Sequence, residues 1–435
     1  MSAFNSVNNH CLGKIMALTE TTDVIASDDI YDSQGVKLWA KGGKISASLQ
    51  ERLASRKLRT PLELTLEVEN GITTGDVADD CQKIILANPI LCHLANSKAA
   101  SASLSHLRMV RLPSALKLLL AAAYGNRGGD EYTHELHTIA LCAGFAAYAQ
   151  LSSMDTELLL SAALLHDLGV LYVNPDLLHA NRQLTAKEWA SVAVHPKVSH
   201  MVALEIGKLR NEVGQGIGQH HERLDGSGYP FMLTKEKISP IGSILAAADA
   251  MAAIIERGGE GAAYQATLAI RLIPEEFDPV LKAYICTSLR DLAGSFGHGD
   301  QPCYEQTRDV VFKLDQVEQK VLELLHSASG KVHDLLLMAG NVCHNVRKAL
   351  RATGVDFLLQ TYIPGGEGAF CGEVYHIVHE TGWRLRNISR TLQLRADALA
   401  LNEQAFLAPL ISILECSPPS SPVDQPDALA ELSPA

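Results

Sequence analysis

Histidine and aspartate side chains are concentrated in one part of this sequence. Imidazole nitrogens and carboxylate oxygens, without thiolates, are ligands that iron, manganese or zinc accept. Two such ions side by side activate water for in-line attack on a phosphodiester. The residues that could build such a centre all lie in or beside segments with helical periodicity: His134, His166, Asp167, His195, His220, His221 and Asp249.

The spacing of these residues suggests how they would share two ions. Between Leu158 and Leu165 only Ser161 interrupts the apolar residues, which predicts a buried helix ending at His166 and Asp167. A buried carboxylate is costly unless it is paired or bound to a metal. An imidazole beside a carboxylate suits a bridge, with the imidazole on one ion and the carboxylate across both.

The adjacent residues His220 and His221 would diverge by roughly 100° on a helix. We therefore expect them to serve different ions. Asp130 lies four residues before His134, which puts the two on one helical face.

Most other histidines are interpreted as structural, because a single buried histidine is more often a hydrogen-bonded core residue than a ligand. This interpretation covers the following residues: His137, His179, His200, His326, and the pair His376 and His379 with its i, i+3 spacing.

The strongest motif in the chain is HHERLDGSGYP at residues 220–230. It resembles the signature of the HD-GYP family, a branch of the HD-domain metal phosphohydrolases. HDLG at 166–169 is similar to the HD-x-G motif of that family. LTAKEW at 184–189, followed by HP at 195–196, is similar to its next segment.

The resemblance extends over residues 130–290. His134 lies 32 residues before His166, as in the family, and Asp249 in AAADAM matches its last aspartate. FDP at 277–279 resembles the start of its closing helix. Several motifs in the same order and at matching distances make the resemblance specific.

The resemblance implies an all-helical domain whose two or three divalent metal ions, iron or manganese, serve the hydrolysis of cyclic di-GMP. His166, Asp167 and Asp249 are the implied catalytic residues. The implied ligands are the seven residues His134, His166, Asp167, His195, His220, His221 and Asp249, and Asp130 stands where some members have a glutamate supporting a third metal. Gly228, Tyr229 and Pro230 form the GYP loop, which is implied to lie beside the site and to contact substrate.

Two positions depart from the family pattern. A lysine commonly follows HD-x-G, and this chain has Val170 instead. Losing one preorganised group that stabilises developing charge typically costs on the order of 10²–10³ in rate. After Asp249 the chain has Ala252 in place of an aspartate, and Arg257, the candidate phosphate ligand, is about one residue out of register. Both departures fall on charge-stabilising positions, which predicts a retained metal site with weakened chemistry.

The regions on either side of the HD-GYP segment predict a mainly α protein of several parts. Residues 1–75 read as a small α/β module, with two short strands in IYDSQGVKLWAKGG, a helix in SASLQERLASRKL and a strand in LELTLEVEN. Residues 76–300 form the helical HD-GYP domain and 301–416 a helical extension, with one long helical stretch at 310–350. The Pro/Ser-rich residues 417–435 are predicted to be disordered.

Composition restricts the class of protein. A net charge of −12 argues against a broad nucleic-acid or anionic-membrane surface. No apolar run reaches the roughly 18 to 20 residues of a membrane span, and the N-terminus lacks the order of a signal peptide. Nine cysteines without a CxxC pair indicate reduced thiols. We therefore expect a cytoplasmic protein, and we expect its terminal helices to form a homodimer.

Three functions remain open at this point. The first is a metal-dependent cyclic di-GMP phosphodiesterase, favoured by the complete ligand set. The second is a catalytically inactive signalling or scaffold protein that binds a partner protein through the GYP loop, favoured by Val170. The third, an HD phosphohydrolase acting on another nucleotide, is disfavoured because the GYP segment is so well kept.

Overall fold

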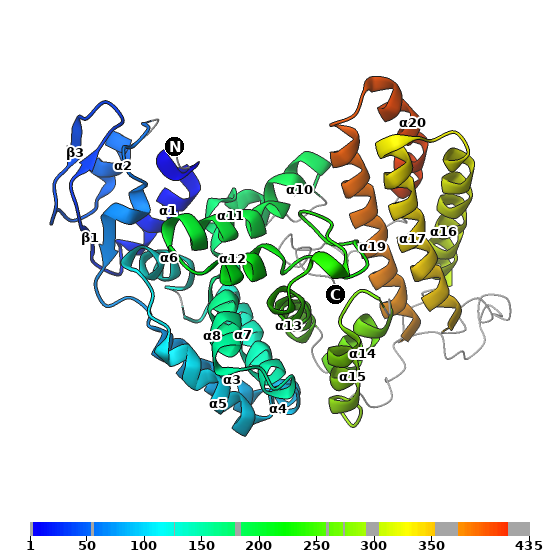
Figure 1. The fold of residues 1–435 in the computed structure, drawn as a ribbon, viewed down its shortest axis with the longest axis horizontal. Helices are drawn as coiled ribbons and strands as arrows, with labels where there is room; N and C mark the ends of the chain where they lie inside the picture. The colour runs from blue at the N-terminus through cyan, green and yellow to red at the C-terminus, as the bar shows by residue number, and fades with distance from the viewer. Residues whose placement is uncertain are drawn as a thin grey trace. The chain divides into compact units, whose positions relative to one another are not determined.

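The protein is mainly helical, as predicted, with two small sheets near its N-terminus (Figure 1). A computed structural model describes residues 3–53, 56–125, 127–178, 184–257, 261–272, 275–292, 304–352 and 373–415. The chain divides into two compact units. The first comprises Met1–Leu178, Ser191–His221 and Ile238–Ala252, and the second comprises His179–Ala190, Glu222–Lys237 and Ala253–Ala435.

The N-terminal part of the first unit contains two antiparallel strand pairs. β1 (Val24–Ala26) pairs with β4 (Leu66–Val68), and β2 (Ile30–Tyr31) pairs with β3 (Lys37–Trp39). The β2–β3 hairpin confirms the two strands predicted around the Ser-Gln-Gly turn. The remaining elements of this part are η1 (Ala3–Asn5), α1 (Asn9–Leu18), α2 (Ala47–Leu53) and η2 (Leu62–Thr65).

One strand prediction was only half right. In LELTLEVEN the residues of η2 form a 3-10 turn, in which the Thr65 hydroxyl donates to the Leu62 carbonyl, and only the following residues extend as β4. Pro61 precedes the turn, and the local hydrogen bond of a threonine competes with a strand ladder.

The helices that carry the histidines make up the rest of the first unit. Leucine and alanine fill the contacts between α7 and α8, which pack on each other and on their neighbours α3, α4, α5 and α12. These elements are α3 (Thr74–Ala87), α4 (Pro89–Ala95), α5 (Ser97–Met109), α6 (Ser114–Tyr124), α7 (Asp130–Tyr148), α8 (Ser153–Leu165), η3 (Leu168–Tyr172), α9 (Pro175–Leu178), α11 (His195–Met201), the π-helical turn η4 (Val202–Ile206) and α12 (Asn211–Gly218). Two more helices, α10 (Ala186–Ala193) and α13 (Pro240–Arg257), contribute to both units.

Long helices dominate the second unit. Apolar side chains of α16, α17, α19 and α20 form one core that includes Leu314, Leu336 and Leu407, as in helix bundles generally. The long helical stretch predicted at 310–350 is divided, because α16 ends at Leu325 and α17 begins at Gly330. The elements of this unit are η5 (Lys235–Lys237), α14 (Ala262–Leu272), α15 (Pro279–Ser288), α16 (Tyr304–Leu325), α17 (Gly330–Ala352), α19 (Glu373–Ala396) and α20 (Leu401–Glu415).

The three boundaries between the four predicted parts of the chain stay predictions. The compact units group residues 1–75 with the first HD helices and assign 179–190 and 222–237 to the second unit. The predicted disordered tail at 417–435 lies outside the described residues, as do His179 and the side chains of His376 and His379.

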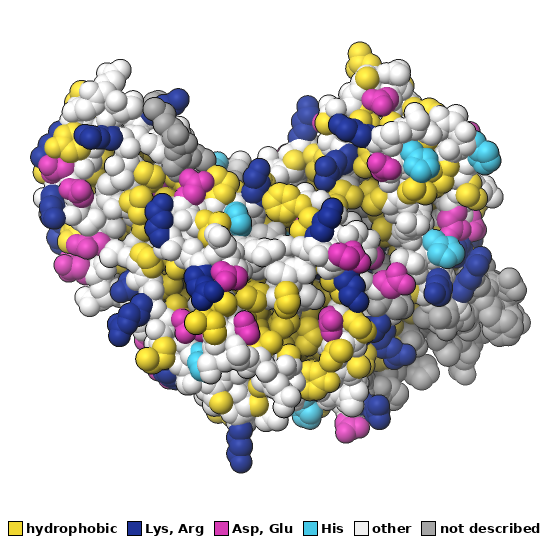
Figure 2. Space-filling view, in the orientation of Figure 1, with side chains coloured by type: hydrophobic (Ala, Val, Ile, Leu, Met, Phe, Trp, Pro, Cys, Tyr) yellow, Lys and Arg dark blue, Asp and Glu magenta, His cyan; other side chains and the backbone are white. Residues whose placement is uncertain are grey.

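Surface composition agrees with the sequence. On the face drawn in Figure 2, basic and acidic side chains are interspersed over the described residues. Within the same described ranges, every helix is too short or too polar to cross a bilayer.

Candidate metal centre

Helix α8 delivers the first histidine and aspartate, as its apolar sequence predicts. Its residues from Leu158 to Leu165 are all buried, and the hydroxyl of Ser161 is satisfied by the carbonyl of Glu157 at 2.7 Å. His166 caps the C-terminus of this helix and Asp167 follows it. The C-terminal end of a helix carries partial negative charge, so a cation is favoured at this point.

Six side chains form two groups, each with ligand atoms within 4.8 Å of one another. One group contains His134, His166 and Asp167, and the other contains His195, His220 and His221. No other group of three such residues is found in the part of the chain that the structure describes.

Two carboxylates join the groups. Asp167 Oδ2 lies 3.4 Å from His166 Nε2, and Asp167 Oδ1 lies 3.3 Å from His195 Nε2 and 3.6 Å from His220 Nε2. Each oxygen therefore faces a different group, which is the arrangement that the adjacent histidine and aspartate suggested.

Asp249, on α13, joins the groups in the same way. Its Oδ1 lies 3.0 Å from His134 Nε2 and its Oδ2 lies 3.4 Å from His221 Nδ1. All seven predicted ligands thus belong to one constellation within the first unit.

His220 and His221 do not lie on a helix, and the grouping of their ligand atoms favours one ion for both over the expected two. Both residues fall within the same group of three, with ring centroids 4.1 Å apart. Helix α12 ends at Gly218 and the two residues lie in the following turn, so their side chains are not separated by the helical angle.

Backbone carbonyls fix the orientation of three of the imidazoles. The Nδ1 atoms of His166, His195 and His220 each lie 2.6 to 3.0 Å from the carbonyl oxygen three residues earlier in the chain. Because a carbonyl only accepts, each Nδ1 carries the proton and a neutral ring presents its Nε2 lone pair to the cluster. This is how metal-binding histidines are commonly oriented.

The residues fit a divalent metal centre. His195 Nε2 and His220 Nε2 lie 3.2 Å apart, so two lone pairs would face each other unless a cation lies between them. Metal–nitrogen bonds of about 2.0–2.1 Å place two ligand nitrogens of one ion about 3.0–3.4 Å apart. In addition, His166 Nε2 and Asp167 Oδ1 are buried without a hydrogen bond.

Charge around the site favours ligation. Burial alone would raise the pKa of Asp167, but His166, His195 and His220 outweigh burial and hold it well below its usual range. Burial lowers the pKa of His220, which keeps this imidazole neutral. Burial also acts to lower the pKa of His166, yet the neighbouring carboxylates raise it. These carboxylates stabilise a cation at Nε2, whether a proton or a metal ion.

Glu135 and Tyr124 support the site, although no sequence pattern indicated either residue. Glu135 Oε2 accepts a hydrogen bond of 2.7 Å from the Tyr124 hydroxyl and lies 3.5 Å from His166 Nδ1. Burial raises the pKa of Glu135 to about 7, although His166 and the tyrosine act in the opposite direction. Glu135 follows the ligand His134 directly, but its contact with His166 arises only from the packing of α7 on α8.

The part of the chain that carries the metal ligands is similar in sequence to known proteins. The HD domain family model matches residues 108–278. The cyclic di-GMP phosphodiesterase PA4108 of Pseudomonas aeruginosa is 33% identical over 41% of this chain and 43% of its own length. A cyclic di-GMP phosphodiesterase of Vibrio cholerae is 28% identical over 59% of this chain and 53% of its own length. The 3'3'-cGAMP-specific phosphodiesterase 3 of Vibrio cholerae is 33% identical over 23% of this chain and 21% of its own length.

The chain therefore matches the HD domain family over residues 108–278, and its similarity to cyclic di-GMP phosphodiesterases supports an HD-GYP assignment for this part. The chain spans between about a fifth and about half of the length of these three relatives.

Several positions of the HD-GYP motifs have structural reasons. A Cβ on Gly169 would lie 2.2 Å from the carbonyl oxygen of His195, so only glycine allows η3 to approach α11. The Gly169 amide donates to Ser199 Oγ at 2.7 Å. Pro196 lies in the first turn of α11, where a missing amide proton costs nothing. In FDP, Asp278 accepts from the amides of two residues of α15 and so caps this helix.

The GYP segment lies in the second unit and is held by local contacts. The carboxylate of Glu222 accepts from the amides of Phe231 and Leu233 at 2.7 and 2.8 Å. Gly226 has a φ of +83°, a conformation that glycine adopts readily. Tyr229 packs edge-on against Trp189 of the LTAKEW segment, with ring centroids 5.5 Å apart. The two motifs therefore contact each other.

The remaining predicted residues lie outside the constellation. Asp130 is exposed in the first turn of α7 and belongs to neither ligand group. Arg257 is exposed at the end of α13, and its Nε donates to the carbonyl of Ala253. Like Gly228, Tyr229 and Pro230, it belongs to the second unit, and its contact with substrate stays a prediction. Val170 is half-buried in η3.

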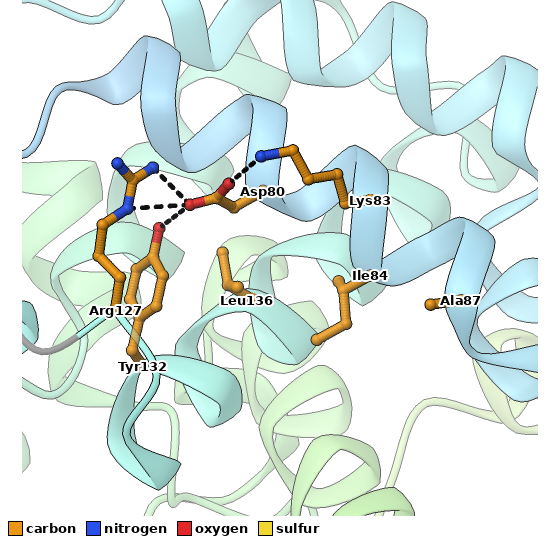
Figure 3. Close-up of a pocket in the computed structure, with 7 residues that line it drawn as sticks. All are labelled: Asp80, Lys83, Ile84, Ala87, Arg127, Tyr132 and Leu136. Carbon is orange, nitrogen blue, oxygen red and sulfur yellow. Dashed lines mark hydrogen bonds and ion pairs between the residues drawn. The ribbon is translucent and has the colours of Figure 1, made fainter.

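A separate, open surface pocket of about 470 Å³ lies between α3 and α7 (Figure 3). Its polar side is a network in which the Asp80 carboxylate accepts from Arg127, Lys83 and the Tyr132 hydroxyl. Because these donors use the hydrogen-bonding capacity of the Asp80 carboxylate, we interpret the network as structural. It holds the residues at the start of α7 against α3.

Proposed function

We propose that this protein is a metal-dependent phosphodiesterase that hydrolyses cyclic di-GMP. The observation that carries the proposal is the pair of ligand groups joined by Asp167 and Asp249. The names of the two relatives with the longest matches support the substrate. Two divalent ions, iron or manganese, would supply an activated water and stabilise negative charge on the phosphodiester.

The residues of this chain divide the work as follows. His134 and His166 would hold one ion, and His195, His220 and His221 the other, with Asp167 and Asp249 shared. His134 and Asp167 have side chains that are 20% and 24% exposed, while the other ligands are nearly or fully buried. The phosphodiester would therefore approach from the side of His134 and Asp167.

A non-hydrolytic signalling role is the second candidate. The observation that favours it is Val170, whose half-buried side chain offers neither charge nor a hydrogen-bond donor. In this role the metal centre would bind the nucleotide without turnover, and the GYP loop would contact a partner protein. The cytoplasmic location, the homodimer and a third ion at Asp130 stay predictions in either case.

Metal content and turnover measured together separate the two candidates. The protein is purified without oxygen, and its metals and its hydrolysis of cyclic di-GMP and 3'3'-cGAMP are measured. The same measurements are made on the variants His166→Ala and Val170→Lys. Two metals per chain, with hydrolysis of cyclic di-GMP that His166→Ala abolishes, would establish the enzyme. Metal without turnover in the wild type, with turnover appearing in Val170→Lys, would establish the signalling role. Preference for 3'3'-cGAMP would overturn the proposed substrate alone.

A further inference from the structure

The residue at the end of η3 is held by the N-terminal part of the first unit. The Tyr172 hydroxyl donates to Glu63 Oε1 at 2.8 Å, and the Tyr172 carbonyl accepts from Asn8 Nδ2 at 3.1 Å. The ring of Phe4 packs edge-on against the ring of Tyr172, with centroids 5.5 Å apart. Three segments of residues 1–75, from η1, the start of α1 and η2, therefore converge on one residue, two on its side chain and one on its backbone carbonyl.

These contacts are built into the interior. Glu63 is 6% exposed and Phe4 is 7% exposed. Asn8 also caps α1, since its Oδ1 accepts from the amides of His10 and Cys11. The same side chain thus orders its own helix and holds Tyr172.

The other end of η3 belongs to the metal centre. Asp167 is the residue immediately before η3, and its carbonyl accepts from the amide of Val170 at 2.9 Å. Within the same turn, Gly169 packs against the carbonyl of His195, and its amide donates to the Ser199 hydroxyl of α11. A displacement of η3 would therefore move Asp167 and change its 3.3 Å separation from His195.

We propose that Tyr172 is a positioning residue for the metal centre, and that Asn8 and Glu63 act on the ligands Asp167 and His195 through it. The five-residue element η3 transmits the position of the N-terminal part to one ligand of each group. Its effect on metal binding is independent of turnover, whereas its effect on hydrolysis rests on the proposed function.

The test removes one hydroxyl and measures manganese binding. Tyr172→Phe deletes the donor to Glu63 and keeps the ring on Phe4. Mn²⁺ is titrated calorimetrically into the metal-free full chain, and amide hydrogen exchange is followed at residues 168–173. Loss of a group that orients ligands typically weakens metal affinity about 10–100-fold. We expect a loss of on the order of tenfold, with faster exchange at 168–173.

Matched variants distinguish positioning from general destabilisation. Tyr31→Phe removes a hydroxyl that donates to Asp29 at 3.2 Å in the same part of the chain, and it should leave Mn²⁺ affinity unchanged. Glu63→Gln retains an oxygen acceptor for Tyr172 and should keep wild-type affinity. Asn8→Asp keeps the helix cap and removes the donor to the Tyr172 carbonyl, so it should weaken Mn²⁺ binding even if Tyr172→Phe fails to fold.

Two results would overturn the inference. One is wild-type Mn²⁺ affinity in both Tyr172→Phe and Asn8→Asp. The other is an equal loss of affinity in Tyr31→Phe. Failure of the wild type to hydrolyse cyclic di-GMP would refute the proposed function and leave this measurement intact.

Discussion

Removing the metal ions should lower the thermal stability of the first unit. Apart from His134, the histidines around the Asp167 and Asp249 carboxylates are buried. Without a metal ion, only protons can compensate the facing lone pairs of His195 and His220. A metal ion that binds only the native state stabilises this state by about 2.7 kcal/mol when the free metal concentration is about 100-fold above the Kd of the site.

The expected shift follows from the size of the unit. In proteins of 150–250 residues, 1 kcal/mol corresponds to roughly 2–4 °C of Tm. Each occupied site should therefore raise the Tm of the first unit by about 5–10 °C. Calorimetric scans in excess Mn²⁺ and in chelator measure this difference directly.

Two variants make the measurement specific. Asp249→Asn alters the carboxylate shared by both groups and should abolish most of the metal-dependent shift. His200 is half-buried, lies outside both groups and bonds the Gly214 carbonyl at 2.7 Å, so His200→Ala should lower the Tm and keep the full shift. Equal melting with and without metal, or a full shift in Asp249→Asn, would refute the reasoning.

Three further predictions concern single positions. Gly169→Ala should destabilise the fold by about 1–3 kcal/mol because the new methyl group overlaps backbone atoms, and it should also reduce the amount of bound Mn²⁺. In the control Gly75→Ala the new methyl group meets nothing closer than 3.5 Å, so bound Mn²⁺ should stay at the wild-type level. Equal metal content in the two variants would count against the close approach of Gly169 to His195. Burial raises the pKa of Glu63 above its ordinary value of 4.5, so the protonated form stabilises the fold and this contribution is lost as pH rises through the raised pKa. The Tm of Glu63→Gln minus that of the wild type should therefore grow between pH 4.5 and 8, and a constant difference would show that the carboxyl does not titrate. Glu276→Ala removes the carboxylate that lies 2.7 Å from the guanidinium of the buried Arg384, and it should cost about 3–5 kcal/mol in urea unfolding. Glu212→Ala at an exposed pair should leave the unfolding midpoint unchanged, and similar midpoints in the two variants would mean that the buried pair contributes little.

The ligand set could be predicted because residue type and spacing carry it. A histidine and an aspartate after eight almost wholly apolar residues are costly in a core unless a cation compensates them, and the structure brings both into the constellation. The contact of Glu135 with His166 could not be predicted, because a glutamate next to His134 in a helix is expected at the protein surface. Its burial follows from packing between α7 and α8, which one sequence does not specify.

Local structure was predictable where hydrogen-bonding side chains did not compete with regular patterns. The β2–β3 hairpin followed from its turn residues. The alternation in LELTLEVEN was misleading because Thr65 bonds backward to Leu62 and closes a 3-10 turn. The geometry of His220 and His221 depended on the end of α12 at Gly218, and helix ends are set within one or two residues by contacts that spacing does not encode.

The imidazoles of His166, His195 and His220 are oriented by carbonyl groups of their own chain segments. Every one of these rings takes its orientation and its proton position from an atom only three residues away. Distant substitutions can therefore move a whole segment without turning its imidazole. Assembly of the centre therefore requires only that short segments with already oriented imidazoles come together. Such segments could be grafted onto an unrelated helical scaffold and keep the orientation of their ligands.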